Sequence, residues 1–159
     1  RTPSSGHSDP VEWALGPRRK DKPRPAGRAW QAGAMTGFQI QQVQHVQLAI
    51  PVGGEERARD YWVRVLGFDE VPKPPLLAAR GGCWFRGTQV EMHMGIEEPF
   101  VPARKAHPAI LVLGLDALAE HLSQTGAQVR WSAEVPGTRR FHTDDPFGNR
   151  LEFIEAPAP

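Results

Sequence analysis

The sequence predicts an α+β fold built from two copies of one unit, in which a strand and a helix are followed by a short strand and a hairpin. Two observations lead to this prediction. Strand-like alternation and helix-like apolar spacing follow one another in the same order in both halves of the chain. Residues of the same type also recur after 59 to 62 positions: His45 and His107, Glu91 and Glu152, and Gly67 and Gly126. Self-similarity at a nearly constant period indicates a duplicated structural unit.

The first copy begins with a strand over residues 41–50, where apolar and polar side chains alternate. Residues 55–66 then carry apolar side chains at helical spacing, and Gly67 is typical of a residue that ends a helix. A short strand is predicted over residues 68–71. Residues 83–94 predict a hairpin, which completes the first unit.

The second copy follows a polar, proline-containing connector over residues 97–105. Residues 107–113 predict an apolar strand, and residues 116–125 predict a helix with leucine and alanine on one face. A short strand over residues 128–131 and a hairpin over residues 141–155 complete the unit.

The second hairpin turns at Asp-Pro-Phe-Gly-Asn, residues 145–149. Proline fixes one φ angle, and glycine and asparagine tolerate the positive φ angles that tight turns need. In the following strand, the two-residue period places Glu152 on the face opposite Leu151 and Phe153. A carboxylate in a strand usually faces water, so the hairpin alone assigns no role to Glu152.

Composition narrows the classes of protein that the chain can belong to. It has 159 residues, of which 40% are hydrophobic and 23% charged, as in an ordinary globular protein. The formal net charge is +1, but residues 1–34 hold seven Lys or Arg against three Asp or Glu. The remaining body is net negative, so we expect no nucleic-acid partner.

The expected compartment is the cytoplasm. Cys83 is the single cysteine, which excludes an internal disulfide and fits a reducing environment. No apolar run is long enough to span a membrane, so we expect no membrane partner. Residues 1–38 are rich in Pro, Gly, Ser and charge, and we expect a disordered tail or a stretch upstream of a natural start at Met35.

Four residues at equivalent positions of the two copies are candidate metal ligands. If a pseudo-two-fold axis relates the copies, these residues converge in one cleft: His45, Glu91, His107 and Glu152. Two imidazoles and two carboxylates suit a divalent metal such as Zn²⁺, Ni²⁺, Mn²⁺ or Fe²⁺. His93 shares a face with Glu91 and is either a competing ligand or a hydrogen-bond partner of the ligand set. Taken singly, each is more typical of an ordinary sheet histidine or a solvated carboxylate.

Three motifs resemble the vicinal oxygen chelate superfamily, which includes glyoxalases, fosfomycin-resistance proteins, extradiol dioxygenases and bleomycin-resistance proteins. The motifs are HVQLAI at residues 45–50, YWVRVLGF at residues 61–68 and DPFGNRLE at residues 145–152. The last is similar to the Asp-Pro-x-Gly-Asn-x-x-Glu hairpin of the superfamily. The resemblance covers roughly residues 43–155 and leaves out the N-terminal tail.

The resemblance implies a domain over residues 39–159, with βαβββ modules over residues 39–98 and 106–156. In such proteins the paired modules form a half-open, U-shaped mixed sheet around a metal, with helices packed outside. The resemblance assigns His45, His107 and Glu152 to the broadly used set of two histidines and one glutamate. Glu91 matches the fourth ligand of the glyoxalase-type site. Since every ligand position is filled, the metal-free, drug-sequestering branch is disfavoured.

The expected function is that of a metal-dependent, glyoxalase-like lyase or isomerase acting on a small metabolite with vicinal oxygens. A metal with open positions chelates two neighbouring oxygens, and Glu152 or Glu91 acts as the base. One alternative is an Fe²⁺ dioxygenase that uses His45, His107 and Glu152. Others are a thiol transferase and a non-catalytic dimeric binding protein.

The substrate is only weakly indicated. Trp84 and Phe141 are candidates for lining an apolar cleft, although most such residues belong to a core. His93 is a further candidate for contacting the substrate. Arg104, Lys105 and Arg140 are candidates for holding an anionic group, with a solvated surface role as the alternative. We also predict a homodimer, because half-open sheets leave edges and apolar faces that a partner covers.

Overall fold

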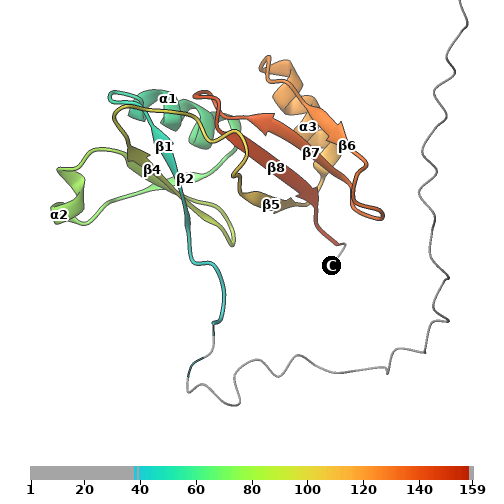
Figure 1. Ribbon diagram of the computed structural model, residues 1–159, viewed down its shortest axis with the longest axis horizontal. Coiled ribbons are helices and arrows are strands. Elements are labelled where there is room, and N and C mark those ends of the chain that lie inside the picture. The colour runs from blue at the N-terminus through green and yellow to red at the C-terminus, as the bar shows by residue number, and fades with distance from the viewer. Residues whose placement is uncertain (1–37, 39, 158–159) are drawn as a thin grey trace, which may run out of the picture. The chain divides into compact units, whose positions relative to one another are not determined.

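The computed structural model describes residues 38 and 40–157 (Figure 1). The predicted tail lies outside the described residues except for Phe38. Within the described residues, those from Gln42 onward form one compact unit, which contains every helix and strand of this part of the chain. Among these elements, no helix combines the length and hydrophobicity needed to cross a bilayer.

The predicted duplicated α+β fold is confirmed by the order of the elements. The first module contains β1 (Val46–Ile50), α1 (Glu55–Arg59), η1 (Asp60–Val65), β2 (Asp69–Val71), α2 (Pro75–Ala78), β3 (Cys83–Arg86) and β4 (Glu91–Ile96). The second module contains β5 (Ala109–Val112), α3 (Leu115–Gln124), β6 (Arg130–Ser132), β7 (Arg140–Asp144) and β8 (Arg150–Glu155).

Each module forms one four-stranded mixed sheet, and the two sheets have the same topology. The strand orders are β1-β4-β3-β2 and β5-β8-β7-β6. The first and last strands of each module pair in parallel, whereas the other pairs are antiparallel. Strands β1 and β5 are therefore sheet edges, and the last strand lies inside each sheet.

Each sheet buries one face against the helix of its own module. In the first module, Met92 and Met94 of β4 are buried with Trp62 of η1. In the second, Leu151 and Phe153 of β8 are buried in the same hydrophobic core as the apolar face of α3. Because strand side chains alternate, residues between these apolar positions lie on the opposite face of each sheet.

The helix predicted over residues 55–66 is divided into α1 and a π-helix, η1. The hydrogen bond from the amide of Leu66 to the carbonyl of Tyr61 is 2.9 Å long and spans five residues. The π-helical geometry accompanies burial of the neighbouring side chains of Tyr61 and Trp62. Hydrophobic periodicity located this helix but did not distinguish an α-helical from a π-helical turn.

A second difference from the prediction is α2. The sequence predicts no element between residues 71 and 83, but the structure has this short helix there, which begins with Pro75. Proline is favoured in the first helical turn, where its missing N–H would have no helical partner anyway. The four-residue helix carries no buried side chain, so apolar periodicity gave no signal for it.

Asn149 connects the two modules through its fully buried side chain. Its Nδ2 donates to the carbonyl oxygen of Ala49 at 2.9 Å and to Oδ2 of Asp145 at 2.8 Å. Its Oδ1 accepts from the backbone amide of Ala103 at 2.9 Å. The turn of the second hairpin is thus anchored to β1 and to the connector between the modules.

Candidate metal site on the second sheet

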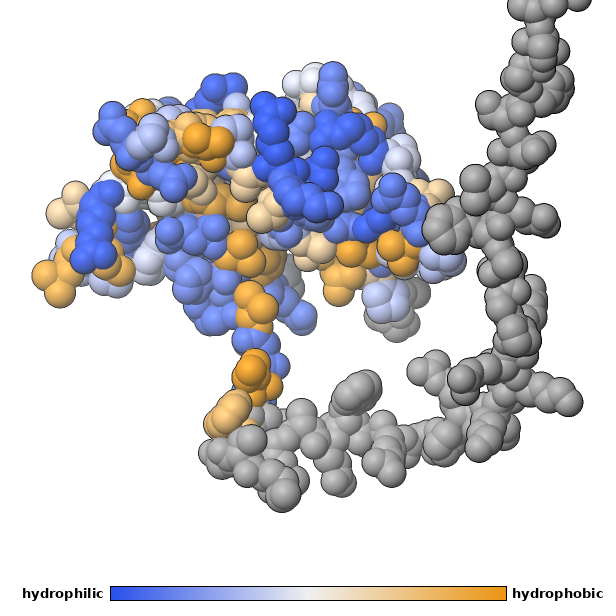
Figure 2. All heavy atoms as spheres, viewed as in Figure 1, coloured by the Kyte–Doolittle hydropathy of each residue, from blue (hydrophilic) through white to orange (hydrophobic). Residues whose placement is uncertain are grey.

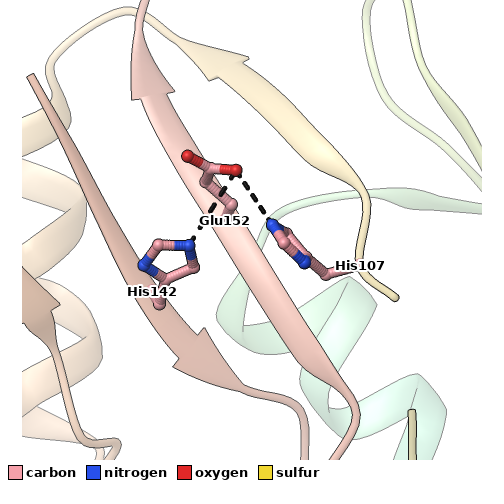
Figure 3. Close-up of side chains that lie close together, drawn as sticks. All are labelled: His107, His142 and Glu152. Carbon is pink, nitrogen blue, oxygen red and sulfur yellow. Dashed lines mark hydrogen bonds and ion pairs between the residues drawn. The ribbon is translucent and has the colours of Figure 1, made fainter. Parts of the chain in front are cut away.

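Three side chains converge on the face of the second sheet opposite its hydrophobic core (Figure 3). His107, His142 and Glu152 each offer one ligand atom, and these atoms lie within 4.8 Å of one another. Nε2 of His107 is 3.0 Å from Oε2 of Glu152, and Nε2 of His142 is 3.9 Å from the same oxygen. Both imidazoles therefore point at one carboxylate oxygen.

The register of three adjacent strands brings these side chains together. In the antiparallel pair β7–β8, His142 lies opposite Glu152. In the parallel pair β5–β8, Ala109 lies beside Glu152, and His107 precedes Ala109 by two residues. The buried apolar residues that flank Glu152 in β8 face the core, so this carboxylate is directed to the other face.

Arg140 holds the second oxygen of the carboxylate. Its guanidinium donates to Oε1 of Glu152 at 2.6 Å, and it also donates to Oγ of Ser132 at 3.3 Å. Oε1 is thereby occupied by a charge-assisted hydrogen bond, while Oε2 is directed at the histidines. This division of the two oxygens leaves one carboxylate oxygen available as a metal ligand.

His107 has the hydrogen-bonding pattern of a metal-binding histidine. Its Nδ1 lies 2.8 Å from the carbonyl oxygen of Lys105. A carbonyl oxygen only accepts, so Nδ1 carries the proton and a neutral ring has a lone pair on Nε2. That lone pair faces a carboxylate oxygen at 3.0 Å, which requires a cation between them, either a proton on Nε2 or a metal ion. A backbone carbonyl that orients the other ring nitrogen is the usual outer partner of a metal-binding imidazole.

The electrostatics of the cluster also suit a metal. Burial lowers the pKa of His142 from its ordinary value, and the nearby charge of His107 lowers it further against the opposing effect of Glu152. Burial of Glu152 opposes its ionisation, but hydrogen bonds from Arg140 and His107 outweigh this and keep its pKa below the usual value. A neutral imidazole and an ionised carboxylate are the forms that bind metal.

The lowered pKa of His142 predicts a pH dependence of stability in the metal-free protein. Below its ordinary pKa of 6.5, His142 binds a proton more readily in the unfolded chain than in the folded one. The contribution of neutral His142 to the stability of the folded protein is therefore fully present above about pH 6.5 and is lost as the pH falls. Urea denaturation at several pH values should show a smaller loss of stability on acidification in His142→Gln than in the wild type. An equal change of stability with pH in the wild type and the variant would contradict the lowered pKa of His142.

The first sheet carries the other predicted ligands, and they form a different arrangement. The rings of Trp84, His93 and His45 stack in a column, with centroid separations of 4.1 Å between successive rings. Oε1 of Glu91 lies 2.9 Å from Nε2 of His93, and Oε2 accepts from Arg86 at 3.1 Å. His45 and Glu91 are not members of the three-residue cluster on the second sheet.

The pairing of the strands does not match the equivalence between the two modules that the 61-residue spacing of Glu91 and Glu152 suggested. Gln47 pairs with His93 in the first sheet, and Ala109 pairs with Glu152 in the second. Since Gln47 and Ala109 each follow a predicted histidine ligand by two residues, His93 and not Glu91 is the positional counterpart of Glu152. Strands β4 and β8 share the same burial pattern in this alignment. The 61-residue spacing of Glu91 and Glu152 therefore did not mark structurally equivalent positions.

The remaining predicted substrate residues lie in different surroundings. Phe141 is fully buried beside Phe153, which places it in the core and not on the face of the cluster. Arg104 and Lys105 are exposed in the connector, and the carbonyl of Lys105 orients His107. Arg140 contacts the cluster, but as the ion-pair partner of Glu152.

His142 is the residue that sequence reasoning missed. The signal was present in the turn, because Asp145 and Asn149 close the hairpin through a backbone hydrogen bond of 2.8 Å. Counting three residues away from this closing pair on each strand places His142 opposite Glu152. The turn sequence thus predicts the hairpin, and the register that it sets along β7 gives the position of His142.

The duplicated modules and their sheet order define a glyoxalase-like α+β fold. Comparisons with known proteins find solved structures that share this fold. A glyoxalase family protein from Bacillus anthracis is 45% identical, with a TM-score of 0.72, over 76% of this chain and 98% of that one. FosX, a fosfomycin resistance protein from Listeria monocytogenes, is 12% identical with a TM-score of 0.61, over 75% and 96% of the two chains. TnmS3, an antibiotic binding protein from Streptomyces sp. CB03234, is 22% identical with a TM-score of 0.58, over 76% and 99%.

The similarity to the Bacillus anthracis protein establishes the family. This chain belongs to the glyoxalase family, within the vicinal oxygen chelate superfamily. The similarities to FosX and TnmS3 support the fold alone. No protein-family model matches the sequence, and no curated protein matches it.

Proposed function

We propose that the protein is a divalent-metal-dependent lyase or isomerase of the glyoxalase type, acting on a small metabolite with vicinal oxygens. One observation carries the proposal. Nε2 of His107 and Oε2 of Glu152 lie 3.0 Å apart, and the Nδ1 proton of His107 is already committed to a backbone carbonyl. A cation between these atoms removes the repulsion, and His142 offers a third ligand atom.

The residues present fit a metal centre of two imidazoles and one carboxylate. Zn²⁺, Ni²⁺, Mn²⁺ and Fe²⁺ all accept this donor set. Such a metal, when bound, acts as a Lewis acid toward a substrate carbonyl. Arg140 holds the carboxylate in position, and the carbonyl of Lys105 holds His107, so both ligands are oriented in advance.

Glu152 is the carboxylate that we propose as the base. It lies within the cluster, whereas Glu91 lies on the first sheet between His93 and Arg86. Hydrogen bonds lower the pKa of both carboxylates, so the choice of Glu152 rests on its place in the cluster and not on its basicity. Glu91 and His45 retain a proposed role at the metal only if the first sheet faces the cluster. That sheet would belong either to the same chain or to the second chain of a dimer.

We further propose a homodimer as the functional form. Strands β1 and β5 are open sheet edges. Hydrophobic surface lies beside β5 (Figure 2), where Leu111 is 64% exposed and Leu113 is 70% exposed. A second copy that covers this surface could place its first sheet opposite the cluster and supply His45.

Metal analysis tests the proposed function most directly. Protein purified without added metal should contain about one Zn²⁺, Ni²⁺, Mn²⁺ or Fe²⁺ per chain, and chelation should lower its melting temperature. Light scattering on the same sample at micromolar concentration should give the mass of a dimer. The mass of a monomer would contradict the proposed homodimer. Absence of metal above background, together with no stabilisation by the four added ions, would overturn the metal-dependent enzyme.

A second candidate function is a metal-free binding protein, favoured by the 2.6 Å contact between Arg140 and Glu152. This ion pair neutralises the carboxylate without a metal, and a protonated His107 completes the pairing. Tight ligand binding without metal or turnover would support this function. An iron dioxygenase or a thiol transferase would use the same ligands, and oxygen consumption with a catechol distinguishes the dioxygenase.

A further inference from the structure

The face that carries the metal cluster holds three arginines on β6, β7 and β8, and the guanidinium of one of them has no partner among the described residues. Three guanidinium groups and two carboxylates lie on this face of β6, β7 and β8: Arg130, Arg140, Arg150, Asp144 and Glu152. Arg140 pairs with Glu152 at 2.6 Å and with Glu134, which follows β6, at 3.4 Å, and Arg130 pairs with Asp144 at 2.9 Å. Arg150 is left, and within the described part of the chain its guanidinium has no hydrogen bond or ion pair.

Comparison with the first module shows how the unpaired arginine arises. Arg86 and Glu91 lie opposite each other in β3–β4 and form an ion pair at 3.1 Å. The corresponding positions in β7–β8 are Asp144 and Arg150, which also lie opposite each other and have opposite charges. They form no ion pair, because Asp144 is bound by Arg130 instead.

Arg130 has no charged counterpart in the first module. Arg130 of β6 pairs with His142 of β7 in strand register. The counterpart of His142 in the first module is Trp84, and Trp84 pairs with the uncharged Val71. The second module therefore carries an additional arginine that occupies Asp144 and leaves Arg150 available. An unpaired guanidinium on a half-buried residue is a ready donor for an oxyanion.

Arg150 is close to the cluster in sequence and in space. It precedes Glu152 by two residues on the same strand, so the two side chains leave the same face of β8. After burial and the charge of His107, the charge of Arg150 contributes to the lowered pKa of His142. The backbone amide of Arg150 donates to the carbonyl of Ala103 at 2.8 Å, which fixes the strand at this point.

We propose that Arg150 binds a carboxylate or phosphoryl group of the substrate beside the metal cluster, so that the substrate of this protein is a small anion. The inference rests on the proposed function, since it names the substrate class of the same site. A divalent metal would add two further positive charges to a face that already carries an unpaired one. Electrostatic complementarity then favours an anionic substrate over a neutral one.

Calorimetric titration with methylphosphonate tests this inference on the full-length chain, both loaded with nickel and free of metal. In either form, Arg150→Met should weaken methylphosphonate binding by about tenfold to a hundredfold, the effect of losing a charge-assisted hydrogen bond. Arg150→Lys should recover part of the affinity because it keeps the charge. Arg80→Met is the matched control, since Arg80 is an exposed arginine of the first module, and it should bind like the wild type.

The possible outcomes separate the two proposals. Unchanged affinity in Arg150→Met, or no binding of millimolar methylphosphonate by the wild type, would overturn the inference. Failure of the wild type to bind nickel or any of the other three proposed ions would instead overturn the metal-dependent function, while the metal-free titration still tests Arg150. Nickel affinity should be retained or increased in Arg150→Met, because a repelling charge is removed. If Arg150→Met does not fold, Arg150→Gln provides the same comparison.

Discussion

Replacing Glu152 by glutamine is expected to abolish metal binding at physiological metal concentrations. The substitution keeps the shape of the side chain but removes the anionic oxygen that faces both histidines. Loss of an outer hydrogen-bond partner alone weakens metal sites by about tenfold to a hundredfold, so loss of a direct ligand should exceed a hundredfold. Competition with a chromophoric chelator measures this affinity.

The same substitution should also destabilise the metal-free protein. The side chain of Arg140 is only 14% exposed and would lose Glu152, the nearer of its two carboxylate partners, while keeping the 3.4 Å contact with Glu134. Removing one member of a buried pair costs about 3 kcal/mol or more, and the remaining contact with Ser132 reduces that cost. Urea denaturation should therefore give a loss of about 1–3 kcal/mol.

Glu155→Gln is the matched control for Glu152→Gln. Glu155 lies on the same strand but pairs with Arg139 at 2.9 Å, away from the cluster. This variant should retain the metal affinity of the wild type. Wild-type affinity in Glu152→Gln would contradict the assignment of this residue as a ligand, and equal losses in both variants would indicate a general effect on the sheet.

Replacing Asn149 by alanine is expected to destabilise the protein by about 3–5 kcal/mol, because several buried polar groups lose their partners at once. The carbonyl of Ala49, the amide of Ala103 and the carboxylate of Asp145 each lose one hydrogen bond. Asn149 is fully buried, so water does not readily replace the missing amide. The midpoint and slope of urea denaturation measure the effect.

Gln124→Ala provides the comparison for Asn149→Ala. Gln124 is an exposed amide on α3 whose side chain bonds only to Glu120, at 3.4 Å. Its replacement should change the free energy of unfolding by no more than about 0.5 kcal/mol. A similarly small effect of Asn149→Ala would show that its hydrogen bonds do not hold the modules together.

The strands and helices of both modules could be predicted closely because their signals are local. Alternating apolar residues marked β1 and β8, helical spacing marked α3, and the Asp-Pro-Phe-Gly-Asn turn marked the β7–β8 hairpin. Helix α2 and the π-helical character of η1 were missed, since neither leaves a distinct pattern of apolar residues. Of the four residues expected to converge, His107 and Glu152 lie 3.0 Å apart, and their role as metal ligands stays a prediction.

The relation between the halves of the chain was harder to predict. A spacing of 61 residues matched Glu91 to Glu152, whereas the strand pairing matches His93 to Glu152. Sequence spacing counts every residue in the intervening loops, but equivalence in a sheet depends on which residues face each other. Loops of unequal length shift that count without moving the strands.

By itself, the sequence determined the duplicated α+β architecture, the turn chemistry and the candidacy of His107 and Glu152, because periodicity and turn preference act over a few residues. Only the tertiary structure decided the partners of these side chains. It placed His142 and Arg140 around Glu152, stacked His45 on His93 in the other sheet, and left Arg150 unpaired. These contacts depend on cross-strand register and on competition between neighbouring charges, which residues distant in the chain settle together.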